Sequence, residues 1–320
     1  MSFFDFFKKK TADNSFADTF DIIDRKNTVA VPSSKTKEKK CIDVLKALSR
    51  NSIVMMPKLK GKVEHPSDSK IGGKPYLPTD FTWPTYTDKE DNVTRSLSFF
   101  CQIKLSEIKP YDKEGLLPER GHLYFFYECE SMRWGFDPED KGAARVFYYD
   151  TTDVIGIAPF DIPEDINEEY VIPEMPLKFK CEKSYPDLEE LEYYGVDDGM
   201  CDDYDDALEK LGVDFDEDDG EHKLLGYANV IQGEMLTEAE RVSRALYCGD
   251  PESYNNTPKD VEEDINRHAA DWMLLCQLST VEKGDFEFMF GDCGMLYFYI
   301  KKQDLKNMNF DNVHFSVQCG

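Results

Sequence analysis

Residues 97–103 read Leu-Ser-Phe-Phe-Cys-Gln-Ile, and a similar pattern returns 175 residues later as Trp-Met-Leu-Leu-Cys-Gln-Leu at 272–278. Both stretches are apolar, favour a strand, and carry Cys-Gln at the same place. A second pair follows at an offset of 173 residues, because Gly121–Tyr127 and Gly294–Ile300 share Gly-x-Leu-Tyr-Phe. Two matches at nearly one offset predict two similar sheet-bearing halves. The alternative is that aromatic strands resemble one another by coincidence.

The sequence around these stretches predicts further strands and helices in mixed order. Strands are expected at 53–56, 145–149, 286–290 and 313–318, and helices at 37–50, 186–194, 202–211, 234–247 and 257–270. Strands joined by short turns pair antiparallel. We therefore expect an α+β fold in which two similar, mainly antiparallel sheet-bearing halves, an internal duplication, pack as one compact unit with peripheral helices.

Composition and charge divide the chain into parts. We expect a loosely attached segment at 1–35 and one domain at 36–320, made of a first half at about 50–160, an acidic insert at about 182–221 and a second half at about 222–320. From Asp187 to Glu221 there are 17 acidic residues and one basic residue, which carry −16 of the net charge of −26. This stretch has few large apolar residues, so we expect it to be solvated and to contribute little to the core.

The whole-chain composition limits the class of protein and of partner. Of 320 residues, 41% are hydrophobic and 13% aromatic, which excludes a disordered chain. The net charge argues against nucleic acid or an anionic membrane as a partner, because those surfaces attract Lys and Arg. Nine cysteines, an odd number, are typical of free thiols in a reducing compartment. With no apolar stretch long enough to span a membrane and no signal peptide, we expect a cytoplasmic protein.

Short motifs of glycine, proline and aromatic residues run through the chain in a fixed order. They include Gly72-Gly-Lys-Pro-Tyr-Leu-Pro78, Trp83-Pro84, Gly121-His-Leu-Tyr-Phe-Phe126, Ile231-Gln-Gly233, Gly291-Asp-Cys-Gly294 and Gln318-Cys319. By these motifs the chain, over roughly residues 50–319, resembles the YwqG family of bacterial proteins, a domain of unknown function. The resemblance implies a compact α+β cytoplasmic bacterial protein, and it implies no activity.

The chain lacks the standard motifs of catalysis and of cofactor or metal binding. The dinucleotide, Walker and nucleophile-elbow motifs are absent. No two cysteines lie within four residues of each other and no His-x3–5-His pair occurs, so zinc is not expected. The string Asp214–Gly220 resembles a calcium loop, but its glycine comes one position late and Leu225 stands where the closing Glu belongs. We predict no catalytic residue, no cofactor and no metal site.

Six residues are candidates for binding in a cleft between the halves: Trp83, Gln102, His222, Gln232, Gln277 and Asp292. The two glutamines also have a structural interpretation, in which each buried amide braces an irregular loop whose backbone groups need partners. His222 is either a general base near Asp292 or a loop histidine bonded to the backbone.

Two functions remain open at this point. The first is a non-catalytic protein that binds a basic protein partner, in the manner of an immunity protein or antitoxin, through its acidic surface. The alternative is a small-molecule binder or hydrolase with its site in the cleft between the two halves. The sequence leaves the oligomeric state open.

Overall fold

The computed structural model describes residues 37–150, 156–196, 201, 204–213 and 221–320. The expected N-terminal segment at 1–35 and the string Asp214–Gly220 lie outside these residues.

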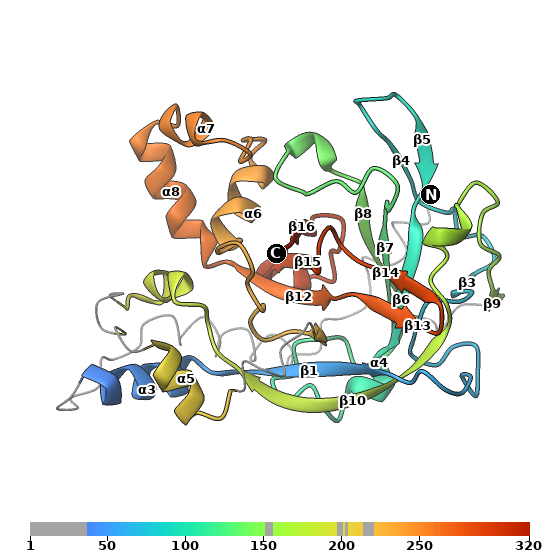
Figure 1. Cartoon of the computed structure of the whole chain (residues 1–320), viewed down its shortest axis with the longest axis horizontal. Coiled ribbons are helices and arrows are strands. Elements are labelled where there is room, and N and C mark those ends of the chain that lie inside the picture. The colour runs from blue at the N-terminus through green and yellow to red at the C-terminus, as the bar shows by residue number, and fades with distance from the viewer. Residues whose placement is uncertain (1–36, 151–155, 197–200, 202–203, 214–220) are drawn as a thin grey trace.

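Within the described residues, one ten-stranded sheet forms the centre of the molecule, and all neighbouring strands in it are antiparallel (Figure 1). Its order is β16-β15-β12-β11-β1-β10-β2-β6-β7-β8. The strands are β1 (Arg50–Pro57), β2 (Lys70–Ile71), β6 (Ser98–Lys104), β7 (His122–Tyr127), β8 (Ala144–Tyr149), β10 (Met175–Ser184), β11 (His222–Leu224), β12 (Trp272–Leu278), β15 (Met295–Lys301) and β16 (His314–Gln318). The loop after β7 reaches the outer edge of β16, where the Val317 N–H donates to the Trp134 carbonyl at 2.9 Å, so the sheet is nearly closed.

Smaller ladders and helices surround this sheet. The ladders pair β3 (Tyr76–Pro78) with β9 (Ile157–Pro159), β4 (Thr85–Thr87) with β5 (Thr94–Ser96), and β13 (Val281–Lys283) with β14 (Phe286–Phe288). The α-helices are α3 (Lys37–Leu48), α4 (Leu105–Ile108), α5 (Tyr204–Lys210), α6 (Leu236–Ser243), α7 (Pro251–Asn255), α8 (Lys259–Ala269) and α9 (Lys302–Lys306). The 3-10 helices are η1 (Pro138–Asp140), η2 (Glu168–Tyr170) and η3 (Glu189–Tyr194).

The predicted mixture of helices with a mainly antiparallel sheet is confirmed. Two of the predicted helix ends coincide with glycines that take positive φ, Gly195 at +72° and Gly212 at +86°. Such a residue terminates a helix because left-handed backbone is easy only for glycine. The stretch predicted as a helix at 186–194 is the 3-10 helix η3.

The repeated segments lie on opposite sides of the central pair β1–β10. We call β2, β6, β7 and β8 the first wing, and β11, β12, β15 and β16 the second wing. The order of pairing is the same in both wings, and a register shift precedes the cysteine in β6 and in β12. The matching sets of cross-strand partners are Lys70–Gln102–Tyr124 with Lys223–Gln277–Tyr297, and Ile71–Cys101–Phe125 with Leu224–Cys276–Phe298.

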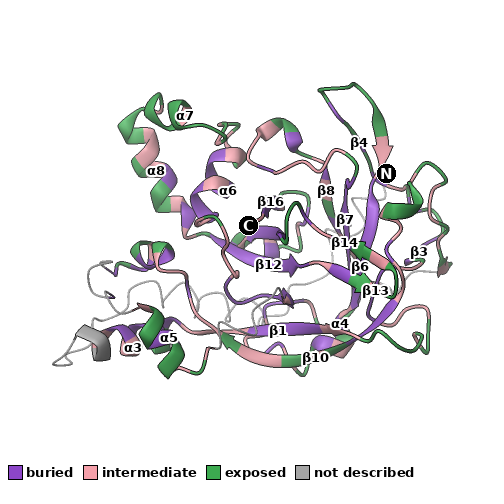
Figure 2. Cartoon of the chain, in the orientation of Figure 1, coloured by how far each residue is buried: buried purple, intermediate pink, exposed green. Residues whose placement is uncertain are grey.

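The two wings meet in one apolar core. Phe125 and Phe298 contact each other edge to face, with ring centroids 5.2 Å apart. Burial and the neighbouring thiol of Cys101 raise the pKa of Cys276 well above its usual range. Strands β7 and β12 are buried along their whole length, whereas α7 lies at the surface (Figure 2). Burial of each large aromatic side chain contributes roughly 2 to 3 kcal/mol, so this seam is a main source of stability.

The acidic stretch packs against the rest of the chain, which corrects the expectation of a solvated insert with little contribution to the core. Helix α3, η3 and α5 surround a second hydrophobic cluster, and we call these three elements the acidic cap (Figure 1). Six buried apolar residues of this cluster come from the stretch itself: Leu191, Tyr194, Val196, Cys201, Ala207 and Leu208. The expectation failed because these few apolar residues all face one side, where α3 covers them.

Candidate functional site

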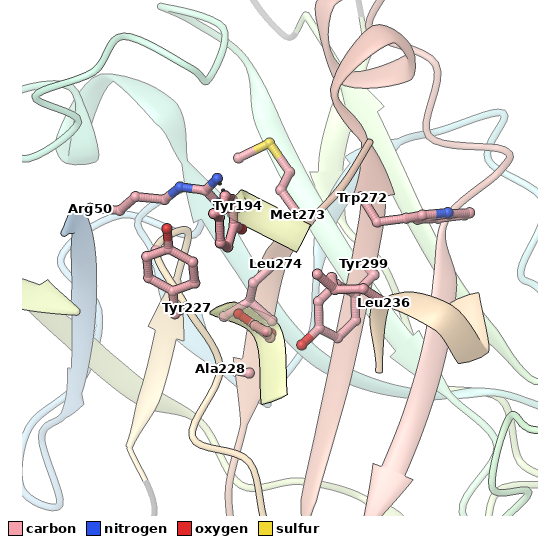
Figure 3. Close-up of a pocket in the computed structure, with 11 residues that line it drawn as sticks. Arg50, Tyr194, Tyr227, Ala228, Leu236, Trp272, Met273, Leu274 and Tyr299 are labelled. Atoms are coloured by element: carbon pink, nitrogen blue, oxygen red, sulfur yellow. Dashed lines mark hydrogen bonds between the residues drawn. The ribbon is translucent and has the colours of Figure 1, made fainter. Parts of the chain in front are cut away.

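A small cavity lies where the acidic cap meets the sheet (Figure 3). Its volume is about 10 Å³, which is close to the room that one water molecule needs. Its ionisable side chains come from three elements and one loop: Arg50 at the start of β1, Glu190 and Tyr194 on η3, Tyr227 in the loop after β11, and Tyr299 on β15. The remaining lining is mainly apolar and comes largely from β12 and the first residue of α6.

The Arg50 guanidinium lies against two tyrosine rings (Figure 3). Its Nη2 donates to the Tyr194 hydroxyl at 3.3 Å, and its Cζ lies 5.6 Å from the Tyr194 centroid and 4.5 Å from the Tyr227 centroid. The Tyr227 hydroxyl donates to the Leu48 carbonyl at the end of α3, at 2.9 Å. Cation–π contacts stabilise such an arrangement by about 1 kcal/mol each. The first strand is therefore tied to both η3 and α3.

Glu190 and Tyr299 both line this cavity, and each has a side-chain oxygen without a partner among the described residues. Their relative exposures are 3% and 1%, and among the described residues neither Glu190 Oε2 nor the Tyr299 hydroxyl has a hydrogen-bond partner. Burial raises the pKa of Glu190 to about 8, although the nearby charge of Arg50 opposes the rise. Burial also raises the pKa of Tyr299 well above its usual range. Near neutral pH both groups therefore carry a proton and can donate as well as accept.

The exposed carboxylates of the acidic cap lie on two of its three elements, whereas α3 carries lysines, among them the exposed Lys46. Five acidic side chains are exposed: Glu189 and Glu192 on η3, and Asp205, Asp206 and Glu209 on α5. The inner face of the same elements is buried in the cluster with α3. The backbone that carries these carboxylates is thus anchored by a packed core.

Gln102 uses both polar atoms of its amide to bond backbone groups on the two segments that flank β2. Its Oε1 accepts from the Tyr76 N–H at 2.9 Å, and its Nε2 donates to the carbonyls of Pro66 and Asp68, each at 2.8 Å. The side chain is fully buried. It braces these segments, as its structural interpretation predicts.

Gln277 makes the corresponding set of bonds in the second wing. Its Oε1 accepts from the Asn229 N–H at 2.8 Å, and its Nε2 donates to the Glu221 carbonyl at 2.9 Å and to Asn229 Oδ1 at 3.1 Å. Because both its amide oxygen and nitrogen are occupied, Gln277 holds the loop after β11.

His222 is also bonded to the backbone. Its Nδ1 accepts from the Ser279 N–H at 3.0 Å, and burial lowers its pKa to about 4. In the first wing the Ser69 hydroxyl occupies the corresponding place and accepts from the Lys104 N–H at 2.9 Å. His222 therefore acts as a neutral acceptor that fixes the end of β12.

The other three candidate residues are spread over the molecule. The Trp83 indole N–H donates to the Leu97 carbonyl at 2.9 Å, and its ring packs edge to face on Phe126. Gln232 and Asp292 are exposed in loops of the second half. His222 and Gln277 lie on the neighbouring strands β11 and β12, but none of the six candidates lines the cavity.

Sequence reasoning missed Arg50, Glu190 and Tyr299. Glu190 stands within an acidic run and looks like its solvated neighbours, while Tyr299 looks like any other aromatic residue of a strand. A weak signal was available for Glu190, because its neighbour Leu191 and Tyr194 mark a buried face of η3.

The described residues show neither a cluster of metal ligands nor a membrane-spanning helix. There, no group of three or more His, Cys, Asp and Glu side chains could hold a metal ion. No helix in this part of the chain has the length and apolar character needed to cross a membrane.

Comparison with known proteins identifies a family. A family model described as "Domain of unknown function (DUF1963)" matches residues 69–319, a range that runs from just before β2 to just after β16. No curated protein matches the chain.

Proposed function

Since the chain belongs to DUF1963, a family described only as a domain of unknown function, we propose its function from its geometry. The protein is non-catalytic and binds a basic protein partner through the outer face of the acidic cap. One observation carries this proposal: five exposed carboxylates stand on η3 and α5, whose inner faces are buried against α3. Like charges held in fixed positions speed the encounter with a basic surface and set its salt dependence.

The alternative, a small-molecule binder or hydrolase in a cleft between the halves, receives less support. Its expected polar residues Gln102, Gln277 and His222 are committed to backbone groups. The cavity beside Arg50 has room for about one water molecule. Catalysis would need a nucleophile or base within reach of a bound substrate.

We further propose that the chain is a YwqG-like bacterial protein of the cytoplasm. The order of its motifs supports the family name, and the range of the family match overlaps the range of that resemblance. All nine cysteines are free thiols, which favours a reducing compartment. A basic toxin domain is the kind of partner that an acidic protein of this type would neutralise.

We also propose that the two wings arose by internal duplication. Support comes from their common register, from the matching bonds of Gln102 and Gln277, and from the contact between Phe125 and Phe298. Contact between equivalent residues of two copies is what a two-fold axis produces. Strand β1 pairs with β11 of the second wing, which follows β10 in the chain, and β10 pairs with β2 of the first wing, which follows β1. This crossed pairing is what an exchange of strands between two copies would produce.

The binding proposal is tested by removing charge from α5. The variant Asp205→Asn/Asp206→Asn/Glu209→Gln should bind a lysine-rich peptide with an association rate about tenfold lower at low ionic strength, and with a flatter salt dependence. Stopped-flow fluorescence at several salt concentrations measures both quantities.

A matched variant controls for net charge. Glu282→Gln/Asp285→Asn/Glu287→Gln removes three exposed charges from the β13–β14 ladder, which lies at the other end of the molecule from α3 and α5 (Figure 1). It should leave the association rate within about twofold. Equal slowing by the two variants would mean that only the total charge matters, and the proposal would fail.

A further inference from the structure

We propose that the cavity beside Arg50 is a binding site for a single water molecule, held between Glu190 Oε2 and the Tyr299 hydroxyl. This water joins η3 of the acidic cap to β15 of the sheet. The inference goes beyond the proposed function, because it concerns how the cap is fixed rather than what it binds.

The two oxygens supply the first part of the argument. Both belong to side chains that are at least 97% buried, and both lack a hydrogen-bond partner among the described residues. A buried polar group without a partner is destabilising, and almost all such groups in folded proteins are bonded to protein or to ordered water. Two unpartnered groups at one cavity therefore indicate a shared small partner.

The size and lining of the cavity identify that partner. A volume of about 10 Å³ matches one water molecule and excludes larger ligands. A buried water needs two to four polar partners, and Glu190 and Tyr299 provide two. The cationic guanidinium of Arg50 disfavours a cation such as ammonium in the same place.

The position of the site explains its consequence. Glu190 lies on η3, and Tyr299 lies on β15, 109 positions further along the chain. The nearby bond from Arg50 to Tyr194 connects η3 to β1. A bridging water adds a second polar link from the same short helix to a different strand, and two links to separate strands fix the orientation of the cap.

Removal of the Tyr299 hydroxyl tests the proposal, because the two possible states of that hydroxyl predict opposite results. If it holds a water, Tyr299→Phe should raise the unfolding equilibrium constant roughly five- to tenfold, since Glu190 and the water lose a partner. If the hydroxyl has no partner, the variant should be neutral or more stable, and the proposal is wrong. Chemical denaturation measures the constant.

A control and a second background make the test specific. Tyr297→Phe, on the same strand, loses the bond of its hydroxyl to the Asn229 carbonyl and sets the scale for one buried hydrogen bond. In a Glu190→Met background the effect of Tyr299→Phe should disappear if the two residues share one water. An undiminished effect would show that they act separately and would overturn the proposal.

A crystal structure of the unmodified protein at high resolution gives the direct measurement. We expect one water within hydrogen-bond distance of both Glu190 Oε2 and the Tyr299 hydroxyl. A dry cavity, or a direct bond between the two side chains, would rule out the site even if the variants fail to fold.

Discussion

The two wings of the sheet share one scheme of strand pairing. They differ in the residue that makes the tight turn after the first strand of each wing, β2 or β11. In each wing a lysine lies opposite the bracing glutamine, and the residue two positions after that lysine has positive φ. This residue is Gly72 at +59° in the first wing and Leu225 at +61° in the second. A Cβ on Gly72 would lie 2.3 Å from the Ile172 carbonyl oxygen, whereas the Leu225 side chain is buried in the core. The shared strand pairing therefore requires a turn with positive φ at this position in both wings. The segment packed against the turn, which contains Ile172 in the first wing, decides whether a side chain fits there.

Ser69 and His222 extend the same comparison. Both accept a bond from the backbone N–H that follows the strand next to them, although one is a hydroxyl and the other an imidazole. The shared requirement is an acceptor, and the side chain that supplies it is free to vary. Of these two acceptors only the imidazole titrates in the acid range, so the His222 acceptor should add a pH response that the Ser69 acceptor lacks.

The largest expected effect tests whether the turn of the first wing has room for a side chain. Gly72→Ala should destabilise the protein by about 4 kcal/mol, because the new Cβ clashes with backbone that has no freedom to move and the left-handed φ adds strain. Gly195→Ala has a similar φ of +72° and nothing within 4 Å of its Cβ, so it should cost about 1 kcal/mol. Thermal and chemical denaturation compare the two, and equal costs would mean that the first wing has room for a side chain after all.

The next effect tests whether the two braces are equivalent. Gln102→Leu and Gln277→Leu should each cost about 3 kcal/mol, since each leaves buried backbone groups without partners. The cost at Gln277 should be slightly lower, because Asn229 Oδ1 keeps its bond from Lys223. Gln303→Leu, on the exposed face of α9, serves as the control and should cost under about 0.5 kcal/mol. A neutral result at one brace alone would argue against equivalent wings.

The smallest effect is the pH response of the second wing. The pKa of His222 is lowered from 6.5 to about 4 by burial, so the unfolded chain takes up a proton at a pH where the folded chain does not. Stability therefore falls as the pH drops from 6.5 toward 4, by about 2 kcal/mol at pH 5. His222→Ser replaces the imidazole by a hydroxyl, the acceptor that the first wing uses. The free energy of unfolding of this variant should therefore fall less between pH 6.5 and 4 than that of the unmodified protein, and the difference between the two curves gives the contribution of His222.

A control isolates that contribution from the carboxylates, which titrate in the same range. Gln303→Leu, on the exposed face of α9, changes no ionisable group, so it should leave the pH dependence of unfolding as it is in the unmodified protein. A His222→Ser curve parallel to that of the unmodified protein between pH 4 and 6.5 would contradict the burial of a neutral imidazole.

Several features of the fold could be predicted because they depend on residues that are close in the chain. Strands such as 272–278 and helices such as 202–211 follow from apolar spacing and from the glycines that end them. The bracing interpretation of Gln102 and Gln277 also followed from sequence, because an amide in a fully apolar strand must find backbone partners. The same local view failed for the acidic stretch, where the charges concealed a one-sided row of apolar residues.

The sequence by itself determined the strands, the repeated Cys-Gln pattern, the acidic character and the absence of familiar catalytic motifs. Only the tertiary structure decided that the acidic stretch packs on α3, and that Arg50, Glu190 and Tyr299 line one cavity. The physical reason is that the periodicity of the sequence shows which side of a helix or strand is apolar. Which other element packs against that side depends on the tertiary arrangement of segments that are distant in the sequence. Arg50 and Tyr299 line the same cavity because β1 and β15 lie in one sheet with only β11 and β12 between them, and nothing near either residue in the sequence encodes that strand order.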